Sequence, residues 1–154
     1  MKDKKSYSIK SLKIVSEVKG NYLEIMNRFD RDLFEALAPK NGPMKIIDFT
    51  GSKKGDRVHL RFGFPVNSDW ISDITADEQN DVEAYFIDEG VELPWPLKYW
   101  QHKHIVRKHG EDRSLIIDDI QYGCSNSVIA SLIYPGIYMG FAPRKKIYKK
   151  YFGE

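Results

Sequence analysis

Two histidines and two aspartates could form a polar cluster inside this protein. His102 and His104 are separated by one residue, so in a strand both imidazoles point to the same face. Asp88 and Asp118 stand in neighbouring segments that alternate in the same way. A histidine pKa near ~6.5 suits general-base chemistry, and a carboxylate beside the ring can orient it. The same side chains could instead hold a metal ion, bind a ligand or bond only to one another.

The segments that carry these residues alternate with a period of two, as strands do. The expected strands are residues 7–18, 44–50, 57–64, 69–77, 82–89, 99–108 and 113–122. Short turns join the last six, which must therefore be antiparallel, because a parallel crossover needs a dozen or more residues. Apolar spacing predicts one or two short helices over residues 22–37. A final helix begins near Asn126, with Pro135 and Pro143 expected to kink or interrupt it.

Alternation also predicts which side chains face the interior. The inner positions of the last four strands are Trp70, Ser72, Ile74, Ala76, Val82, Ala84, Phe86, Asp88, Trp100, His102, His104, Val106, Ser114, Ile116, Asp118, Ile120 and Tyr122. The polar groups in this set would each cost about 2 to 7 kcal/mol if they were buried without partners. A partly hydrated pocket explains them better than a solid core does, because ligand sites are mostly apolar with a few polar groups.

We therefore expect a pocket that binds a small hydrophobic molecule, with the protein as its carrier or sensor. The candidate ligand-binding residues are Phe62, Trp70, Phe86, Asp88, Trp95, Trp100, His102, His104, Asp118 and Tyr122. Three alternatives stay open. The aromatic side chains could simply fill the core, and the histidines could be locked in place by the aspartates and Tyr122. An enzyme could use His102 or His104 as its base, or these two histidines and an aspartate could bind a metal ion. We favour binding, and we assign no catalytic residue and no metal ligand.

A family resemblance runs through the same residues. The pattern consists of Phe86-Ile-Asp88-Glu89, Pro94, Trp100-Gln-His102-Lys-His104, Asp118-Asp-Ile-Gln-Tyr122, and a last helix with Phe141 and Arg144. In order and spacing it resembles a bacterial branch of the SRPBCC superfamily, which includes START lipid-transfer domains, polyketide cyclases and the birch pollen allergen.

The resemblance implies an α+β protein with the helix-grip fold. In that fold a seven-stranded curved antiparallel sheet surrounds a long C-terminal helix, and two short helices follow the first strand. The resemblance also implies that a lipid, an isoprenoid or a polyketide-like molecule binds in an internal cavity. Because the members of the superfamily differ in chemistry, it transfers no catalytic residue. A cyclase, dehydratase or hydrolase that uses the cavity histidines and aspartates is the alternative.

Composition excludes several other functions. The 154 residues suit a single domain over 1–154, with residues 1–6 expected to be flexible. With 24 basic and 22 acidic residues, the charge is too balanced for a nucleic-acid-binding surface. The basic run from Arg144 to Lys150 is interpreted as solvating charge. A single cysteine, Cys124, excludes an intrachain disulfide, and no signal peptide is recognised, so we expect a cytoplasmic protein.

One uncharged stretch could be mistaken for a membrane span. Residues 121–143 carry no charge and are followed directly by Arg144 and Lys145. Several serines and the Pro135-Gly136 pair dilute the stretch, so we expect a helix buried against the sheet and no membrane span. The sequence contains no phosphate-binding glycine loop, no GxSxG and no HExxH, so we predict no cofactor. The oligomeric state is not indicated.

Overall fold

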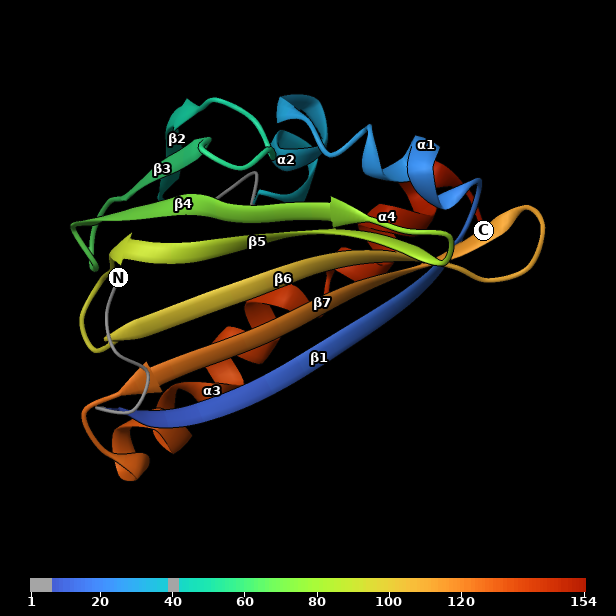
Figure 1. Ribbon diagram of the computed structural model, residues 1–154. Coiled ribbons are helices and arrows are strands. Elements are labelled where there is room, and N and C mark those ends of the chain that lie inside the picture. Colours follow the sequence, from blue (N-terminus) through green and yellow to red (C-terminus); the bar gives the residue numbers. More distant parts are fainter. Residues whose placement is uncertain (1–6, 39–41) are drawn as a thin grey trace.

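The computed structural model of the protein describes residues 7–38 and 42–154 (Figure 1), so the expected flexibility of residues 1–6 lies outside the described residues. Seven antiparallel strands form one sheet in the order β1-β7-β6-β5-β4-β3-β2. Their bounds are β1 Ser8–Lys19, β2 Met44–Phe49, β3 Arg57–Phe62, β4 Ser68–Gln79, β5 Glu83–Glu92, β6 Tyr99–Lys108 and β7 Arg113–Cys124. Each strand joins a neighbour in the chain except β1, which pairs with β7. The predicted fold class is confirmed.

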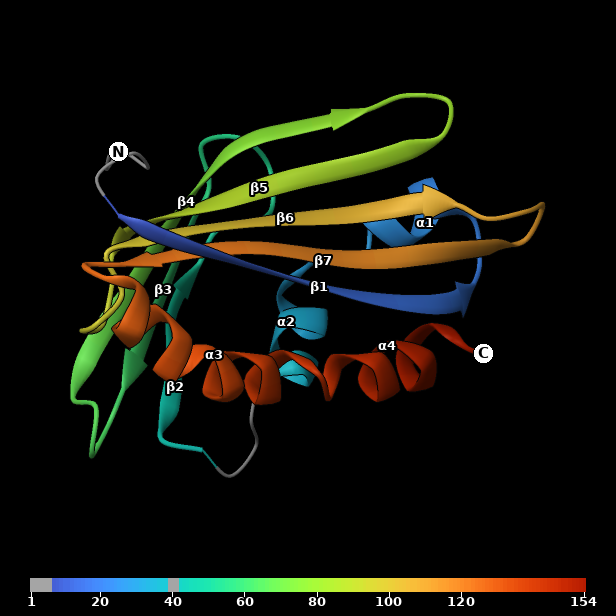
Figure 2. The same ribbon diagram turned by 90° about the horizontal axis from the view of Figure 1, so that it is seen from below.

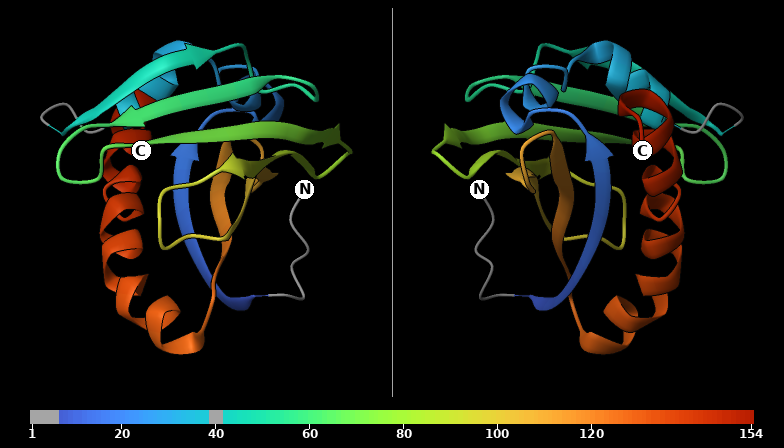
Figure 3. Two further views of the ribbon diagram at one scale, coloured as in Figure 1. Left: turned by 90° about the vertical axis from the view of Figure 1, so that its left-hand side faces the viewer. Right: turned by 90° about the vertical axis from the view of Figure 1, so that its right-hand side faces the viewer.

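Within the described residues, four helices cover the concave side of this sheet (Figure 2). They are α1 Tyr22–Met26, α2 Arg31–Leu37, α3 Ser127–Phe141 and α4 Arg144–Phe152. Asparagine or aspartate side chains cap the first three, because Asn21, Asp30 and Asn126 accept hydrogen bonds from backbone N–H groups of the first turn. Figures 2 and 3 show that α3 and α4 follow one another as a rod, around which the sheet curves.

The interruption of the last helix falls at Pro143 and not at Pro135. Helix α3 continues through Pro135 to Phe141, and α4 begins after Pro143. A proline inside a helix leaves the carbonyl one turn earlier without its partner. Here both Pro135 and Ser131, which carries that carbonyl, are exposed, so water can supply the missing hydrogen bond.

The uncharged stretch that suggested a membrane span is divided between two elements. Residues 121–124 complete β7, and the helix starts only at Ser127. Within the described ranges, no helix combines the length and the apolar character that crossing a membrane requires.

The predicted inner faces are correct on β6 and β7 and fail at two places, one on β4 and one just before β5. A bulge between Ile74 and Ala76 shifts the register of β4, so that Asp77 pairs with Phe86. Ala76 therefore leaves the inner face, and the prediction for it is wrong. Val82 is also wrongly placed, because it lies in the turn before β5 with 56% of its surface exposed.

Tyr122 joins the sheet to α3. Its side chain is fully buried, and its hydroxyl donates a hydrogen bond of 2.7 Å to the carbonyl oxygen of Ala130. Burial raises the pKa of this hydroxyl to about 12, so it remains a neutral donor.

We expect Tyr122→Phe to lower the free energy of unfolding by about 1 kcal/mol, the usual net value of one such bond. Urea unfolding would measure this change. Tyr138→Phe is the control, because that hydroxyl lies on the exposed face of α3 and should contribute nothing. Equal unfolding midpoints for wild type and Tyr122→Phe would show that the bond is not stabilising.

Candidate ligand-binding site

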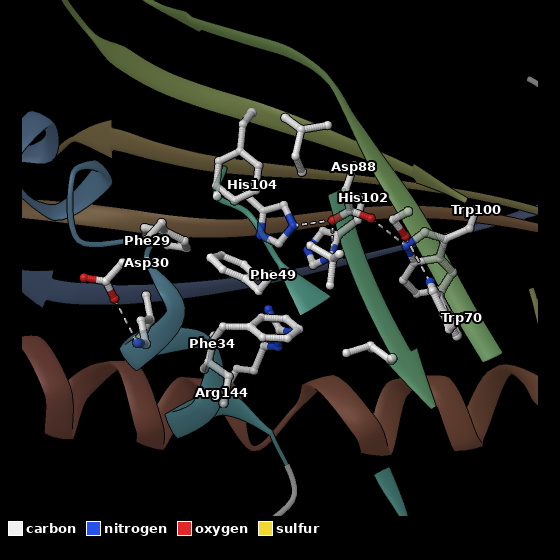
Figure 4. A pocket seen from close by; sticks show the side chains of 18 of the residues that line it. Phe29, Asp30, Phe34, Phe49, Trp70, Asp88, Trp100, His102, His104 and Arg144 are labelled. Atoms are coloured by element: carbon white, nitrogen blue, oxygen red, sulfur yellow. Dashed lines mark hydrogen bonds and ion pairs between the residues drawn. The ribbon is translucent and has the colours of Figure 1, made fainter. Parts of the chain in front are cut away.

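A cavity of about 100 Å³ lies between the sheet and the helices (Figure 4). Helix α2, the segment before it, strands β2 to β6 and the junction of α3 with α4 all contribute to its wall. Aromatic rings form much of the wall: Phe29, Phe34, Phe49, Trp70, Phe86, Trp100 and Phe141. The polar side chains in the lining are Asp30, Ser72, Asp88, His102, His104 and Arg144.

Hydrogen bonds and ring contacts hold the two tryptophans in this wall. The rings of Trp70 and Trp100 meet edge to face with centroids 4.7 Å apart. The indole N–H of Trp70 donates to Ser72 Oγ at 3.1 Å, and that of Trp100 donates to Asp88 Oδ1 at 3.2 Å. Both indoles therefore have hydrogen-bond partners, and the wall that they form is ordered before any ligand arrives.

The two histidines are stacked on each other at one side of the cavity. Their ring centroids are 3.6 Å apart, and Phe86 stacks on the other face of His104 at 4.2 Å. His102 Nε2 lies 2.8 Å from Asp118 Oδ1, and His104 Nε2 lies 2.6 Å from Asp88 Oδ2. Ionised carboxylates only accept hydrogen bonds, so both Nε2 atoms must carry protons.

The carboxylates of this cluster are ionised. Burial by itself would raise the pKa of Asp118, but the charge of Arg144 and the hydrogen bond from His102 outweigh burial and hold that pKa far below its usual range. The pKa of Asp88 is also lowered, because the hydrogen bond from His104 and the neighbouring charges more than offset burial.

His104 is neutral near pH 7. Burial, together with the electrostatic effect of the neighbouring His102 ring, lowers the pKa of His104 to about 4. Because Nε2 holds the ring proton, Nδ1 carries a lone pair. This Nδ1 atom is buried, lies 4.0 Å from Asp118 Oδ1, and has no hydrogen-bond partner within residues 7–38 and 42–154. The arrangement offers a proton acceptor beside the cavity.

Arg144 joins α4 to this cluster. Its guanidinium lies 3.2 Å from Asp118 Oδ1 and 4.6 Å from the centre of the Phe141 ring. Arg144 also donates to the hydroxyl of Tyr148, which in turn donates to Asp118 at 3.5 Å. Burial raises the pKa of Tyr148, so its hydroxyl stays protonated. Asp118 is thus shared by His102, Arg144 and Tyr148.

Six of the ten predicted site residues line the cavity: Trp70, Phe86, Asp88, Trp100, His102 and His104. Asp118 lies behind the lining and holds two of its side chains, His102 and Arg144. Phe62 packs against Trp70 outside the lining, and Tyr122 bonds to α3.

The placement of Trp95 in the interior is wrong. Its surface is 78% exposed, because it lies in the loop after β5, where strand alternation no longer applies.

The sequence did not predict the part of the cavity wall that comes from the helices. The only signal for that part was the Phe141 and Arg144 pair in the family pattern.

The ligand atoms of the alternative metal site lie close together, but the two imidazole rings are not oriented to bind one ion. Asp88, His102 and His104 each offer a ligand atom within 4.8 Å of the others. However, the two imidazole rings are stacked with centroids 3.6 Å apart and planes 25° apart, so their lone pairs lie in two separate, nearly parallel planes, and one ion cannot lie in both. The absence of a bound metal remains a prediction.

Solved structures from plants and bacteria share this architecture. Norcoclaurine synthase from Thalictrum flavum superposes with a TM-score of 0.66 at 16% identity, covering 97% of each chain. The chain has the helix-grip fold. A hypothetical protein from Helicobacter pylori gives a TM-score of 0.65 at 16% identity over 97% of this chain and 90% of that one.

A major latex-like protein from Panax ginseng has the same helix-grip fold, with a TM-score of 0.59 at 16% identity over 90% and 95% of the two chains. No protein-family model and no curated protein matches the sequence. At such identities the likeness establishes the fold alone.

Proposed function

We propose that the protein binds a small, mainly apolar molecule that carries one polar group. The observation that carries this proposal is the cavity, in which an aromatic wall meets a single cluster of polar side chains. Ligand sites have this composition, because apolar contacts supply affinity and a few polar groups fix orientation. The unpartnered Nδ1 of His104 supports the proposal, since a buried acceptor without a partner is costly.

The volume of the cavity favours an occupant about the size of one ring. An apolar cavity of ~150 Å³ can hold benzene, whereas drug-sized ligands need ~300 Å³ or more. At about 100 Å³ this cavity would have to expand slightly to enclose one ring, and about threefold to enclose a larger ligand such as a lipid or a long isoprenoid. A norcoclaurine synthase with the same fold, with a TM-score of 0.62 at 17% identity over 89% and 84% of the two chains, was solved with dopamine and hydroxybenzaldehyde. Each of those molecules has one ring.

Acid–base catalysis in the same cavity is the second candidate function. It is favoured by the two histidine–aspartate pairs, since Asp88 holds the Nε2 proton of His104 and leaves Nδ1 as a base. Binding ranks first because it requires only the cavity. The expected cytoplasmic location stays a prediction.

Tryptophan fluorescence provides the test, because Trp70 and Trp100 lie in the wall. Titration with a series of single-ring molecules should give a saturable change in emission. Val58→Phe, which adds volume inside the cavity, should weaken binding by at least about tenfold, equivalent to ~1.4 kcal/mol.

Val82→Phe makes the same substitution at an exposed turn and should leave the affinity unchanged. The proposal would be abandoned if no molecule of this size bound, or if both variants bound as wild type does.

A further inference from the structure

Within the described residues, the carboxylates around the cavity outnumber its lysine and arginine side chains. Two carboxylates, Asp30 and Asp88, and one guanidinium, Arg144, belong to the lining. Asp118 lies behind it, and Arg144 makes its ion pair with Asp118 at 3.2 Å. Within the described part of the chain, Asp88 has no lysine or arginine within ion-pair distance.

The hydrogen-bond donors that reach Asp88 are neutral. They are the indole N–H of Trp100 at 3.2 Å and Nε2 of His104 at 2.6 Å. His104 is uncharged at neutral pH, because burial lowers its pKa to about 4. The nearest further nitrogen is His102 Nδ1, at 3.7 Å from Asp88 Oδ2. A carboxylate in low-dielectric surroundings is strongly stabilised by a cation, and the described residues place no lysine or arginine directly against this one.

Asp88 is also the carboxylate of the cluster that a ligand can reach. Its side chain is 14% exposed and belongs to the lining, whereas that of Asp118 is 1% exposed. Figure 4 shows Asp88 between His104 and Trp100, with Trp70, Phe34 and Phe49 around the same space. Aromatic rings attract cations through their negative faces, and this attraction grows when water is excluded.

We propose that the polar group of the ligand is a cation, such as a protonated primary amine on a single ring, and that it pairs with Asp88. This inference rests on the proposed binding function. The ammonium donates its hydrogen bonds to Asp88 and supplies the missing positive charge, while the ring fills the aromatic part of the cavity. A carboxylate ligand would instead bring a further negative charge close to Asp30, Asp88 and Asp118.

Three probes of nearly equal size test the inference at pH 7: benzylamine, which is protonated, benzyl alcohol, which is neutral, and benzoate, which is an anion. Calorimetric titration should give an affinity for benzylamine at least about tenfold higher than for benzyl alcohol, with benzoate the weakest. Asp88→Asn should remove this advantage by weakening benzylamine about tenfold and changing benzyl alcohol by less than about threefold. Glu89→Gln, on the outer face of the same strand, is the matched control.

The outcomes separate the inference from the function on which it rests. Binding of none of the three probes would remove the proposed function itself. Binding of benzyl alcohol or benzoate as tightly as benzylamine would overturn the inference and leave the function standing. The three affinities of the wild-type protein decide by themselves whether a cation is preferred, so the test can still be made if Asp88→Asn does not fold.

Discussion

Asp118→Asn should lower the free energy of unfolding by about 3 to 5 kcal/mol, which is the usual cost of removing one partner from a buried ion pair. The Asp118 side chain is 1% exposed and accepts hydrogen bonds from His102, Arg144 and Tyr148. The asparagine side chain has nearly the same shape as aspartate but carries no negative charge. The Arg144 guanidinium would then be left in the interior without the carboxylate that compensates it.

Urea unfolding at pH 7 measures this effect, and the neighbouring residue gives a matched control. Asp119 lies on the opposite face of β7, where its side chain is 31% exposed and 3.9 Å from Lys13. Asp119→Asn should therefore cost less than about 0.5 kcal/mol. A double variant, Asp118→Leu with Arg144→Met, should be more stable than Asp118→Asn, because it buries no unpaired charge. Equal midpoints for Asp118→Asn and Asp119→Asn would refute this account.

The sheet-derived half of the site could be predicted from the sequence. His102, His104 and Asp118 alternate with charged or polar neighbours, and one face of each strand had to be buried. Once the faces were assigned, the antiparallel register could bring these side chains together, as it does where His104 pairs with Asp118. The same reasoning fails at Ala76, because a bulge inserts one extra residue into the strand and reverses the faces after it. It also fails at Trp95, because side chains in a loop do not alternate between two faces.

The helix-derived half could not be predicted by the same means. Phe34 stacks on Phe49 across 15 residues of chain, and only the packing of α2 against the sheet brings the two together. The interpretation of Arg144 as one of a run of solvating charges is wrong. It is the member of the run that pairs with Asp118, while Lys145, Lys146 and Lys150 are exposed. Nothing in the basic run itself distinguishes the inward arginine from the outward lysines.

The stability of the protein should fall by about 2 kcal/mol between pH 7 and pH 5 because of His104 alone. The pKa of His104 is about 4 in the folded protein and 6.5 without the fold, so the unfolded chain binds more protons between these values. The stabilisation is therefore present above pH 6.5 and is lost as the pH falls toward 4. The groups that face His104 are Asp88, Asp118 and His102, with Arg144 beyond them.

Both aspartates have lowered pKa values, so the stability that their ionised forms contribute is lost only at still lower pH. The free energy of unfolding should therefore fall gradually between pH 7 and pH 5 and more steeply below pH 4. The decisive measurement is the difference between urea midpoints at pH 7 and pH 5 for His104→Gln and for wild type. For His104→Gln, the difference between the midpoints at pH 7 and pH 5 should be much smaller than for wild type, whatever the stability of the variant at pH 7. His109→Gln removes an exposed histidine near Glu17 and should keep the wild-type difference. If His104→Gln kept the wild-type difference too, the acid sensitivity would arise elsewhere, and His104 would not be a neutral, buried base.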